Sequence, residues 1–179
     1  METSAQIEKL KDAFHYVIAR VGARAGFGAT KLYKVLWFAE ARSFVLTGSP
    51  IFGTDFIREK HGPVPRDAMR IRGELVSEGR AKIWRDSWHN RNIWRFKALT
   101  DPQMEKFSSA ELETLNFWIK HIDEDHTAES ISEESHDYGW EIAKLGEVLP
   151  VHAFLAQRLR EPTLDELKRA QRRFGHLGI

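Results

Sequence analysis

Two short polar stretches carry the side chains that could do chemistry in this sequence. The first, His121 to His126 (HIDEDH), combines two imidazoles with carboxylates, which are side chains that zinc accepts as ligands. On a continuous helix His121 and Asp125 share a face, and His126 falls one residue beyond it, so these three are not expected to converge on one ion. The sequence therefore predicts an acidic helix end here and no metal site.

The second stretch, Ser135-His136-Asp137, contains the residue types of a hydrolase triad. Triads are assembled from residues far apart in the chain, and the sequence has no GxSxG nucleophile elbow. A small hydrolase would need a pocket that brings Ser135 against His136 and a carboxylate. The glycine-rich stretch 22–29 (GARAGFGA) matches neither phosphate-binding pattern. We therefore expect no catalytic residues, no cofactor and no enzyme activity.

Alternating apolar and polar residues predict a β-hairpin in the middle of the chain. Its strands are expected over about 80–86 and 92–99, with the residues between them in a loop. Three large aromatic side chains are expected on one face of the hairpin: Trp84, Trp94 and Phe96. Because an isolated hairpin is only marginally stable, helices are expected to cover this face.

The same hairpin is rich in residue types that bind macromolecules. It is predominantly basic, and the segment that follows it, 101–141, is rich in carboxylates. Two solvated faces of opposite charge explain this pattern, and so does a surface that steers a partner. Aromatic and arginine side chains are enriched in protein interfaces. The candidate partner-binding residues are Trp88, Arg91 and Trp94 in the hairpin, with His61 and Arg66 beside a GPVP turn. For Trp94, packing in the core is the competing interpretation.

The element that must position these candidates is a central helix expected over about 30–47. Its apolar residues recur at helical spacing, at Leu32, Val35, Leu36, Ala39 and Leu46. Aromatic residues occupy much of the remaining circumference, which is typical of a helix buried in a core. Thr30 is the expected N-cap, and Gly48 is expected to end the helix.

The other expected elements surround this helix. An amphipathic helix over 4–21, capped by Ser4, should pack on it, and the prolines of GPVP should hold an extended turn before the next helix. Further helices are expected over 66–78, from Ser108 to His126, over 127–135, near Trp140 and over 149–159. The predicted fold is α+β and predominantly helical, with one domain over 1–160 and an accessory helix or tail over 161–179.

The order of two helices and a hairpin over 30–99 also resembles a winged helix-turn-helix. In this alternative the protein is a DNA-binding transcriptional regulator. The helix from Arg66 would then expose Arg66, Arg70 and Arg72 to the major groove. The hairpin aromatics could also stack on single-stranded nucleic acid. A net charge of only +1 and the carboxylate-rich segment argue against both forms of nucleic-acid binding.

The composition is that of a globular cytoplasmic protein. The 179 residues include 42% hydrophobic and 30% charged residues, and there is no cysteine for a disulfide or a thiolate metal site. No apolar run approaches the length needed to span a bilayer, and the N-terminus lacks a hydrophobic signal core. We therefore expect no membrane partner.

Several segments resemble the Panacea domain, the SocA-like antitoxin family. Residues 31–39 (KLYKVLWFA) are similar to its KLQKLLYFA helix, 46–52 (LTGSPIF) to LTGKPLF, and 60–65 (KHGPVP) to KYGPVVP. Residues 135–140 are similar to its TH....W element. The resemblance covers about 30–155. It departs from the family pattern at Tyr33, His61 and Ser135, which puts in doubt any site built from those polar positions.

The resemblance implies an antitoxin of a two-gene toxin–antitoxin system. Family members are similar in fold, a compact helical domain with a small β element, and usually neutralise their toxins by direct binding. At least one relative acts as an adaptor that delivers its toxin to a protease. The implied partner is therefore a cognate protein toxin encoded nearby, with a protease as a second partner in the adaptor case.

Overall fold

The computed structural model describes residues 3–152 and 154, without the side chains of Trp88 and Arg91. The described elements are α1 (Ser4–Val21), α2 (Ala29–Thr47), β1 (Phe56–Glu59), β2 (Gly62–Pro65), α3 (Ala68–Ser77), β3 (Ala81–Trp88), β4 (Arg91–Ala98), α4 (Ser109–Asp125), α5 (Ala128–Glu134), α6 (Tyr138–Ile142) and β5 (Val148–Leu149). The predicted α+β, predominantly helical fold is confirmed. The predicted tail over 161–179 lies outside the described residues.

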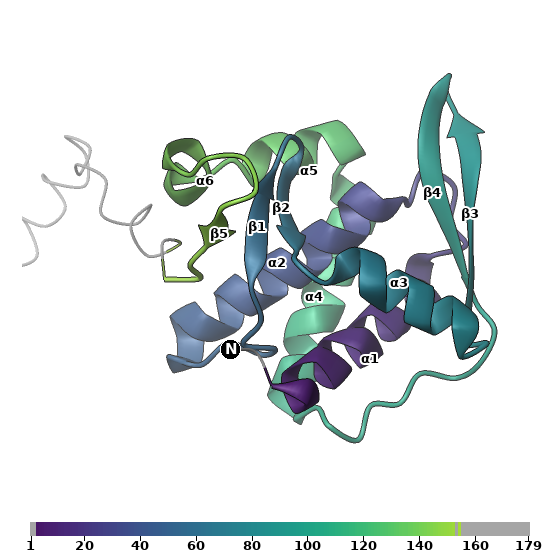
Figure 1. Ribbon diagram of the computed structural model, residues 1–179, viewed down its shortest axis with the longest axis horizontal. Coiled ribbons are helices and arrows are strands. Elements are labelled where there is room, and N and C mark those ends of the chain that lie inside the picture. Colours follow the sequence, from purple (N-terminus) through teal and green to yellow (C-terminus); the bar gives the residue numbers. More distant parts are fainter. Residues whose placement is uncertain (1–2, 153, 155–179) are drawn as a thin grey trace, which may run out of the picture.

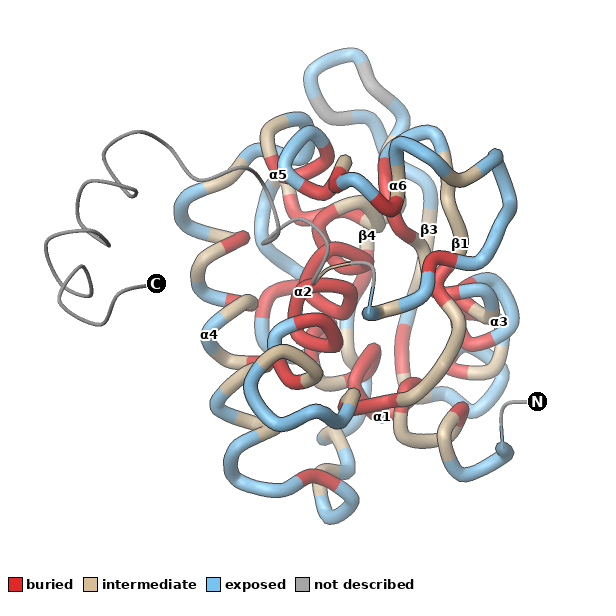
Figure 2. The backbone as a smooth tube through the Cα atoms, turned by 90° about the vertical axis from the view of Figure 1, so that its left-hand side faces the viewer, coloured by how far each residue is buried: buried red, intermediate tan, exposed pale blue. Residues whose placement is uncertain are grey.

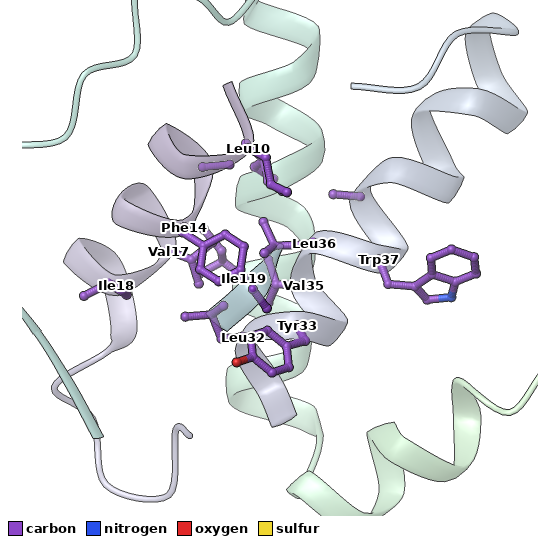
Figure 3. Close-up of a cluster of buried hydrophobic side chains, with 14 of the residues drawn as sticks. Leu10, Phe14, Val17, Ile18, Leu32, Tyr33, Val35, Leu36, Trp37 and Ile119 are labelled. Atoms are coloured by element: carbon purple, nitrogen blue, oxygen red, sulfur yellow. The ribbon is translucent and has the colours of Figure 1, made fainter. Parts of the chain in front are cut away.

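Helix α2 is the centre of the molecule, with α1 and α4 packed beside it (Figure 1). Leu32, Val35 and Leu36 have no exposed surface, and they meet apolar side chains of α1 and α4 such as Phe14 and Ile119 (Figure 3). Figure 2 shows buried backbone concentrated along α2 and exposed backbone around it. The aromatic sequence pattern therefore predicted the central helix correctly.

The ends of α2 differ from the sequence prediction. Gly28, in an extended conformation, is the N-cap, and Thr30 lies inside the helix, so Thr30 is not the cap. Gly48 ends the helix in the left-handed region at φ 75°, as predicted. The expectation that Leu46 rejoins the buried face is wrong, since it is 65% exposed. The last turn of α2 extends beyond the elements that cover the rest of the helix (Figure 1).

Side-chain caps define the starts of three other helices. Thr3, not the predicted Ser4, caps α1 and forms a capping box with Gln6. Ser108 caps α4 and Thr127 caps α5, and each also forms a capping box, with Glu111 and Ser130 respectively. Each box satisfies backbone N–H groups that would otherwise lack a partner at the helix start.

The GPVP segment is a β-strand and not the turn that the sequence suggests. It forms β2, which pairs antiparallel with β1, and β1 pairs on its other side with β5, giving the order β2-β1-β5. Pro63 and Pro65 are tolerated because β2 lies at the edge of this sheet, where a missing N–H costs no ladder bond. The β5 strand, Val148–Leu149, stands where the sequence predicts the start of a helix over 149–159.

Helix α3 is shorter than predicted and is amphipathic. It begins at Ala68, so Arg66 precedes it, and it buries Ile71 and Leu75. Its apolar residues Met69 and Val76 lie off this buried face and are 68% and 48% exposed. Among the described residues, no helix combines the length and apolar character needed to cross a membrane.

Candidate protein-binding surface

The β3–β4 hairpin is longer and more tightly closed than the sequence predicts. Its strands pair from Ala81 opposite Ala98 to Trp88 opposite Arg91. The connecting turn is only His89-Asn90, and both residues have positive φ, at 46° and 59°. This is the backbone of a type I′ turn, whose twist matches that of the strands. Trp88 and Arg91 are therefore the last paired strand residues and not loop residues; their side chains lie outside the described part of the structure.

The register divides the hairpin aromatics between two faces. Phe96 lies opposite Ile83, and Trp84 lies opposite Arg95 one position further along β3. Because neighbouring residues of a strand point to opposite faces, Trp84 does not share the face of Trp94 and Phe96. The expectation of three aromatics on one face is wrong for Trp84. Phe96 is fully buried, and Trp94 is half-buried.

Trp94 is held by two arginines. The guanidinium carbons of Arg72 and Arg85 lie 3.9 and 4.4 Å from its ring centre, distances typical of cation–π contacts. Arg72 is itself buried on α3 and donates a hydrogen bond to the Tyr33 hydroxyl at 3.3 Å. Core packing therefore accounts for part of the role of Trp94, since it joins the hairpin to α3.

A second contact fixes β4 to the loop between α1 and α2. Arg95 donates to the carbonyl oxygens of Ala23 and Arg24, at 3.2 and 2.9 Å. Gly28, at the end of the same loop, also lies beside β4, since a Cβ there would be in van der Waals contact with the Trp94 carbonyl oxygen at 3.4 Å. The inner part of the hairpin is thus anchored from two sides, while its turn stands away from the helices (Figure 1).

A cleft of about 620 Å³ lies between the hairpin, the start of α2 and the junction of α4 with α5. Its lining includes residues 28–31, 92–94 and 126–129, together with His89. A volume of this size is typical of binding sites for small ligands or for a few side chains of a partner. We call this cleft, with the outer end of the hairpin, the hairpin cleft.

The five predicted partner-binding residues do not form one patch. Trp94 lines the hairpin cleft, and the Trp88–Arg91 pair directly flanks the turn residue His89, which also lines it. His61 is exposed in the β1–β2 turn, and Arg66 pairs with Asp55 at the other end of β2. The length of β2 separates His61 from Arg66 by about 16 Å.

Sequence reasoning missed a buried lysine that joins three segments. Lys34 is 1% exposed, and its Nζ donates to the Pro63 carbonyl oxygen at 2.8 Å. Gly62, at φ 90°, packs so closely that an added Cβ would lie 2.1 Å from Ser135 Oγ and 2.8 Å from Lys34 Nζ. Burial lowers the pKa of Lys34 to about 7. We call Lys34, Gly62, Pro63 and Ser135 the buried lysine centre.

A buried carboxylate plays a matching role further along α2. Glu40, 1% exposed, accepts hydrogen bonds from the backbone N–H groups of Phe52 and Gly53 at 2.8 and 2.7 Å. Burial raises its pKa to about 7, although these hydrogen bonds act in the opposite direction. The sequence pattern did not single out Lys34 or Glu40, because both lie in a helix that was predicted from its apolar residues.

The Ser135-His136-Asp137 stretch has structural contacts. The Ser135 hydroxyl donates to the Ser132 carbonyl oxygen at 2.6 Å, and the His136 ring stacks on Trp140 at 3.6 Å between ring centres. Asp137 caps α6 by accepting from the Trp140 backbone N–H at 2.8 Å. These three side chains therefore make hydrogen-bonding, stacking and capping contacts within this part of the fold.

The arginines that a winged helix would direct at DNA are engaged elsewhere. Arg70 binds Asp67 and Glu74 at 2.8 and 2.9 Å. The expectation that Arg72 is exposed is wrong, because it is 6% exposed beneath Trp94. Helix α3 therefore does not present the arginine row that groove binding would use.

The HIDEDH stretch is not the continuous helix that the sequence prediction assumed. Helix α4 ends at Asp125, and His126 takes an extended conformation at φ −125° and ψ 144°. The chain turns there, and His126 Nε2 comes within 3.3 Å of His121 Nε2.

These features define the class: a predominantly helical α+β domain that carries aromatic and basic groups on a projecting hairpin. The chain belongs to the antitoxin SocA-like, Panacea domain family, whose model matches residues 32–141. This confirms the resemblance, over a shorter span than the expected 30–155. The matched span contains the buried lysine centre and most of the hairpin-cleft lining, and it implies a toxin partner in general terms. No curated protein and no solved structure matches the chain.

Proposed function

We propose that this protein is the antitoxin of a two-gene toxin–antitoxin system and neutralises a cognate protein toxin in the cytoplasm by direct binding. Family membership supports the antitoxin role. We place the binding surface at the hairpin cleft, because a projecting hairpin stands beside a cleft of about 620 Å³ there. We further propose that the protein acts by binding and not by catalysis.

The hairpin is suited to binding because its inner part is rigid. Trp94 is clamped between Arg72 and Arg85, and Arg95 ties β4 to the loop before α2. A surface that is already ordered loses little conformational entropy on binding, so more of the contact energy appears as affinity. The outer residues Trp88 and Arg91 are of types that dominate binding energy in protein interfaces.

Coexpression with the neighbouring gene tests the proposal. The product of that gene should arrest growth when expressed alone, and growth should recover when this protein is coexpressed. The two proteins should then copurify in a fixed ratio. Indifference of growth to the product of every adjacent gene would contradict the proposed function.

The lifetime of the toxin separates two routes of neutralisation. If the antitoxin blocks the toxin, a stable complex accumulates and the toxin level in the cell stays high. If it delivers the toxin to a protease, the toxin level falls when the antitoxin is present and recovers when the protease is removed. A pulse-chase measurement of the toxin distinguishes these outcomes.

A further inference from the structure

We propose that the junction of α4 and α5 binds a divalent transition-metal ion, with Zn²⁺ as the representative ion. The ligands are Nε2 of His121, Nε2 of His126 and a carboxylate oxygen of Glu134. One ligand atom from each residue lies within 4.8 Å of the other two. This site does not depend on the proposed antitoxin function.

The distances between the ligand atoms suit tetrahedral coordination. With Zn–N bonds of about 2.0–2.1 Å, two ligand atoms of a tetrahedron lie about 3.3 Å apart. His121 Nε2 and His126 Nε2 are 3.3 Å apart, and His126 Nε2 is 3.5 Å from Glu134 Oε2. The Glu134 side chain is 46% exposed, so it can adjust without disturbing the core.

The other ring nitrogen of each histidine is already engaged. Asp125 Oδ2 lies 2.8 Å from Nδ1 of His121. A carboxylate only accepts hydrogen bonds, so in the neutral imidazole this contact places the proton on Nδ1 and leaves a lone pair on Nε2. Ser130 Oγ lies 3.2 Å from Nδ1 of His126. Partners of this kind orient metal-binding histidines in known sites.

Ser130 Oγ has hydrogen-bond partners besides His126. Ser130 Oγ also lies 3.3 Å from the Thr127 carbonyl oxygen and accepts from the Thr127 N–H at 3.0 Å. When the serine hydroxyl donates to that carbonyl, Nδ1 of His126 must be the donor to Ser130, and both Nε2 atoms carry lone pairs. Two lone pairs facing each other repel unless a cation lies between them. The competing arrangement is a direct hydrogen bond between the two imidazoles.

The surroundings hold the rings in place. The centre of the His121 ring lies 5.8 Å from that of Phe117, on which it stacks, and 5.5 Å from that of Trp118, which it meets edge-on. The His126 side chain is only 15% exposed. Imidazole and carboxylate ligands suit zinc and neighbouring transition metals, whereas Mg²⁺ and Ca²⁺ prefer oxygen ligands alone. The ion would join the last turn of α4 to the end of α5, beside the part of the hairpin cleft that His126 lines.

Titration of the untagged, metal-free full-length protein with Co²⁺ tests this site. We expect one equivalent to bind with the intense visible absorption of tetrahedral Co²⁺, and Zn²⁺ to displace it while Mg²⁺ and Ca²⁺ do not. His126→Gln and Glu134→Gln should each weaken Zn²⁺ binding by at least about tenfold. The matched controls Glu133→Gln and His152→Gln, both at exposed positions, should bind like the wild type.

Thermal unfolding provides a second readout. Zn²⁺ should raise the melting temperature of the wild type and of Glu133→Gln, because ligand binding stabilises the folded state, and should raise that of His126→Gln by clearly less at the same Zn²⁺ concentration. Circular dichroism confirms that each variant is folded before the comparison. Absence of the Co²⁺ absorption in the wild type, or equal affinity in Glu134→Gln and Glu133→Gln, would overturn the proposal and favour a direct hydrogen bond between the imidazoles.

Discussion

The buried lysine centre and the hairpin cleft use polar residues in opposite ways. In the centre, Lys34 is sealed from solvent, and its Nζ finds a backbone carbonyl within 2.8 Å. At the hairpin, Lys82 and Arg85 are exposed. A buried charge without a partner is costly, so substitutions in the buried lysine centre should destabilise the fold strongly. Substitutions of exposed side chains such as those of the hairpin should cost little in folding free energy.

The family-like motifs meet in the buried lysine centre. Lys34 comes from the KLYKVLWFA segment, Gly62 from KHGPVP and Ser135 from the segment that ends at Trp140, and the three pack together. Trp140 Nε1 in turn donates to the Glu59 carbonyl oxygen at 3.0 Å. These motifs therefore build the fold. We propose that residues outside these motifs, such as those of the hairpin, select the particular partner.

The largest effect is expected from Gly62→Ala. The new Cβ would overlap Ser135 Oγ and Lys34, and the backbone at φ 90° is unfavourable for alanine. We expect a loss of about 3–5 kcal/mol in the free energy of unfolding, measured by denaturant titration. The control is Gly73→Ala in α3, where a Cβ meets no atom within 4 Å, and this change should be neutral or stabilising by about 1 kcal/mol. Equal effects at the two glycines would contradict the close packing of the centre.

The next largest effect is expected from Glu40→Ala. This change leaves the buried N–H groups of Phe52 and Gly53 without their acceptor, at a cost of about 2–4 kcal/mol in the free energy of unfolding. Glu40→Gln should cost less, since its amide oxygen still accepts one hydrogen bond. If Glu40→Ala unfolds at the same denaturant concentration as the wild type, the carboxylate does not hold this loop.

A pH effect is expected from Lys34. Its pKa is about 7 in the folded protein and has the ordinary value of 10.5 in the unfolded chain. Between these values the unfolded chain binds more protons, so raising the pH favours the folded state. The unfolding free energy of the wild type minus that of Lys34→Met should therefore rise between pH 7 and pH 10, by at most about 1.4 kcal/mol per pH unit. A difference that stays flat would show that Lys34 titrates normally.

The smallest effect on folding is expected at the outer end of the hairpin. Trp88→Ala combined with Arg91→Ala changes the last paired residues of the hairpin, beside its two-residue turn. We expect the free energy of unfolding to fall by no more than about 1 kcal/mol. A loss comparable to that of Gly62→Ala would mean that the hairpin end is part of the folding core.

Much of the fold could be predicted because its signals are local. Helical spacing identified α1, α2 and α4, the serine and threonine caps marked α4 and α5, and alternation found the β3–β4 hairpin. The three-stranded sheet was not predicted, because β2 contains two prolines and β5 has only two residues, so neither shows a strand pattern in the sequence. Propensity alone does not reveal which distant segments pair.

The sites were harder to predict because they depend on contacts distant in sequence. Lys34 finds its partner 29 residues away, and Glu40 contacts backbone groups 12 and 13 residues away. The convergence of His121 and His126 depends on where α4 ends. The capping Thr127 was a usable signal for that end, since a helix cap at 127 implies that the preceding helix has stopped.

The most direct test of the hairpin cleft is the affinity for the toxin, measured by calorimetry with purified proteins. Trp88→Ala combined with Arg91→Ala should weaken binding by about 10- to 100-fold while the domain stays folded. The matched control, Lys82→Ala combined with Trp84→Ala, also removes one basic residue and one tryptophan, but from the inner half of the hairpin, and should bind like the wild type. Unchanged affinity in the first variant, or equal losses in both, would contradict toxin binding at the hairpin cleft.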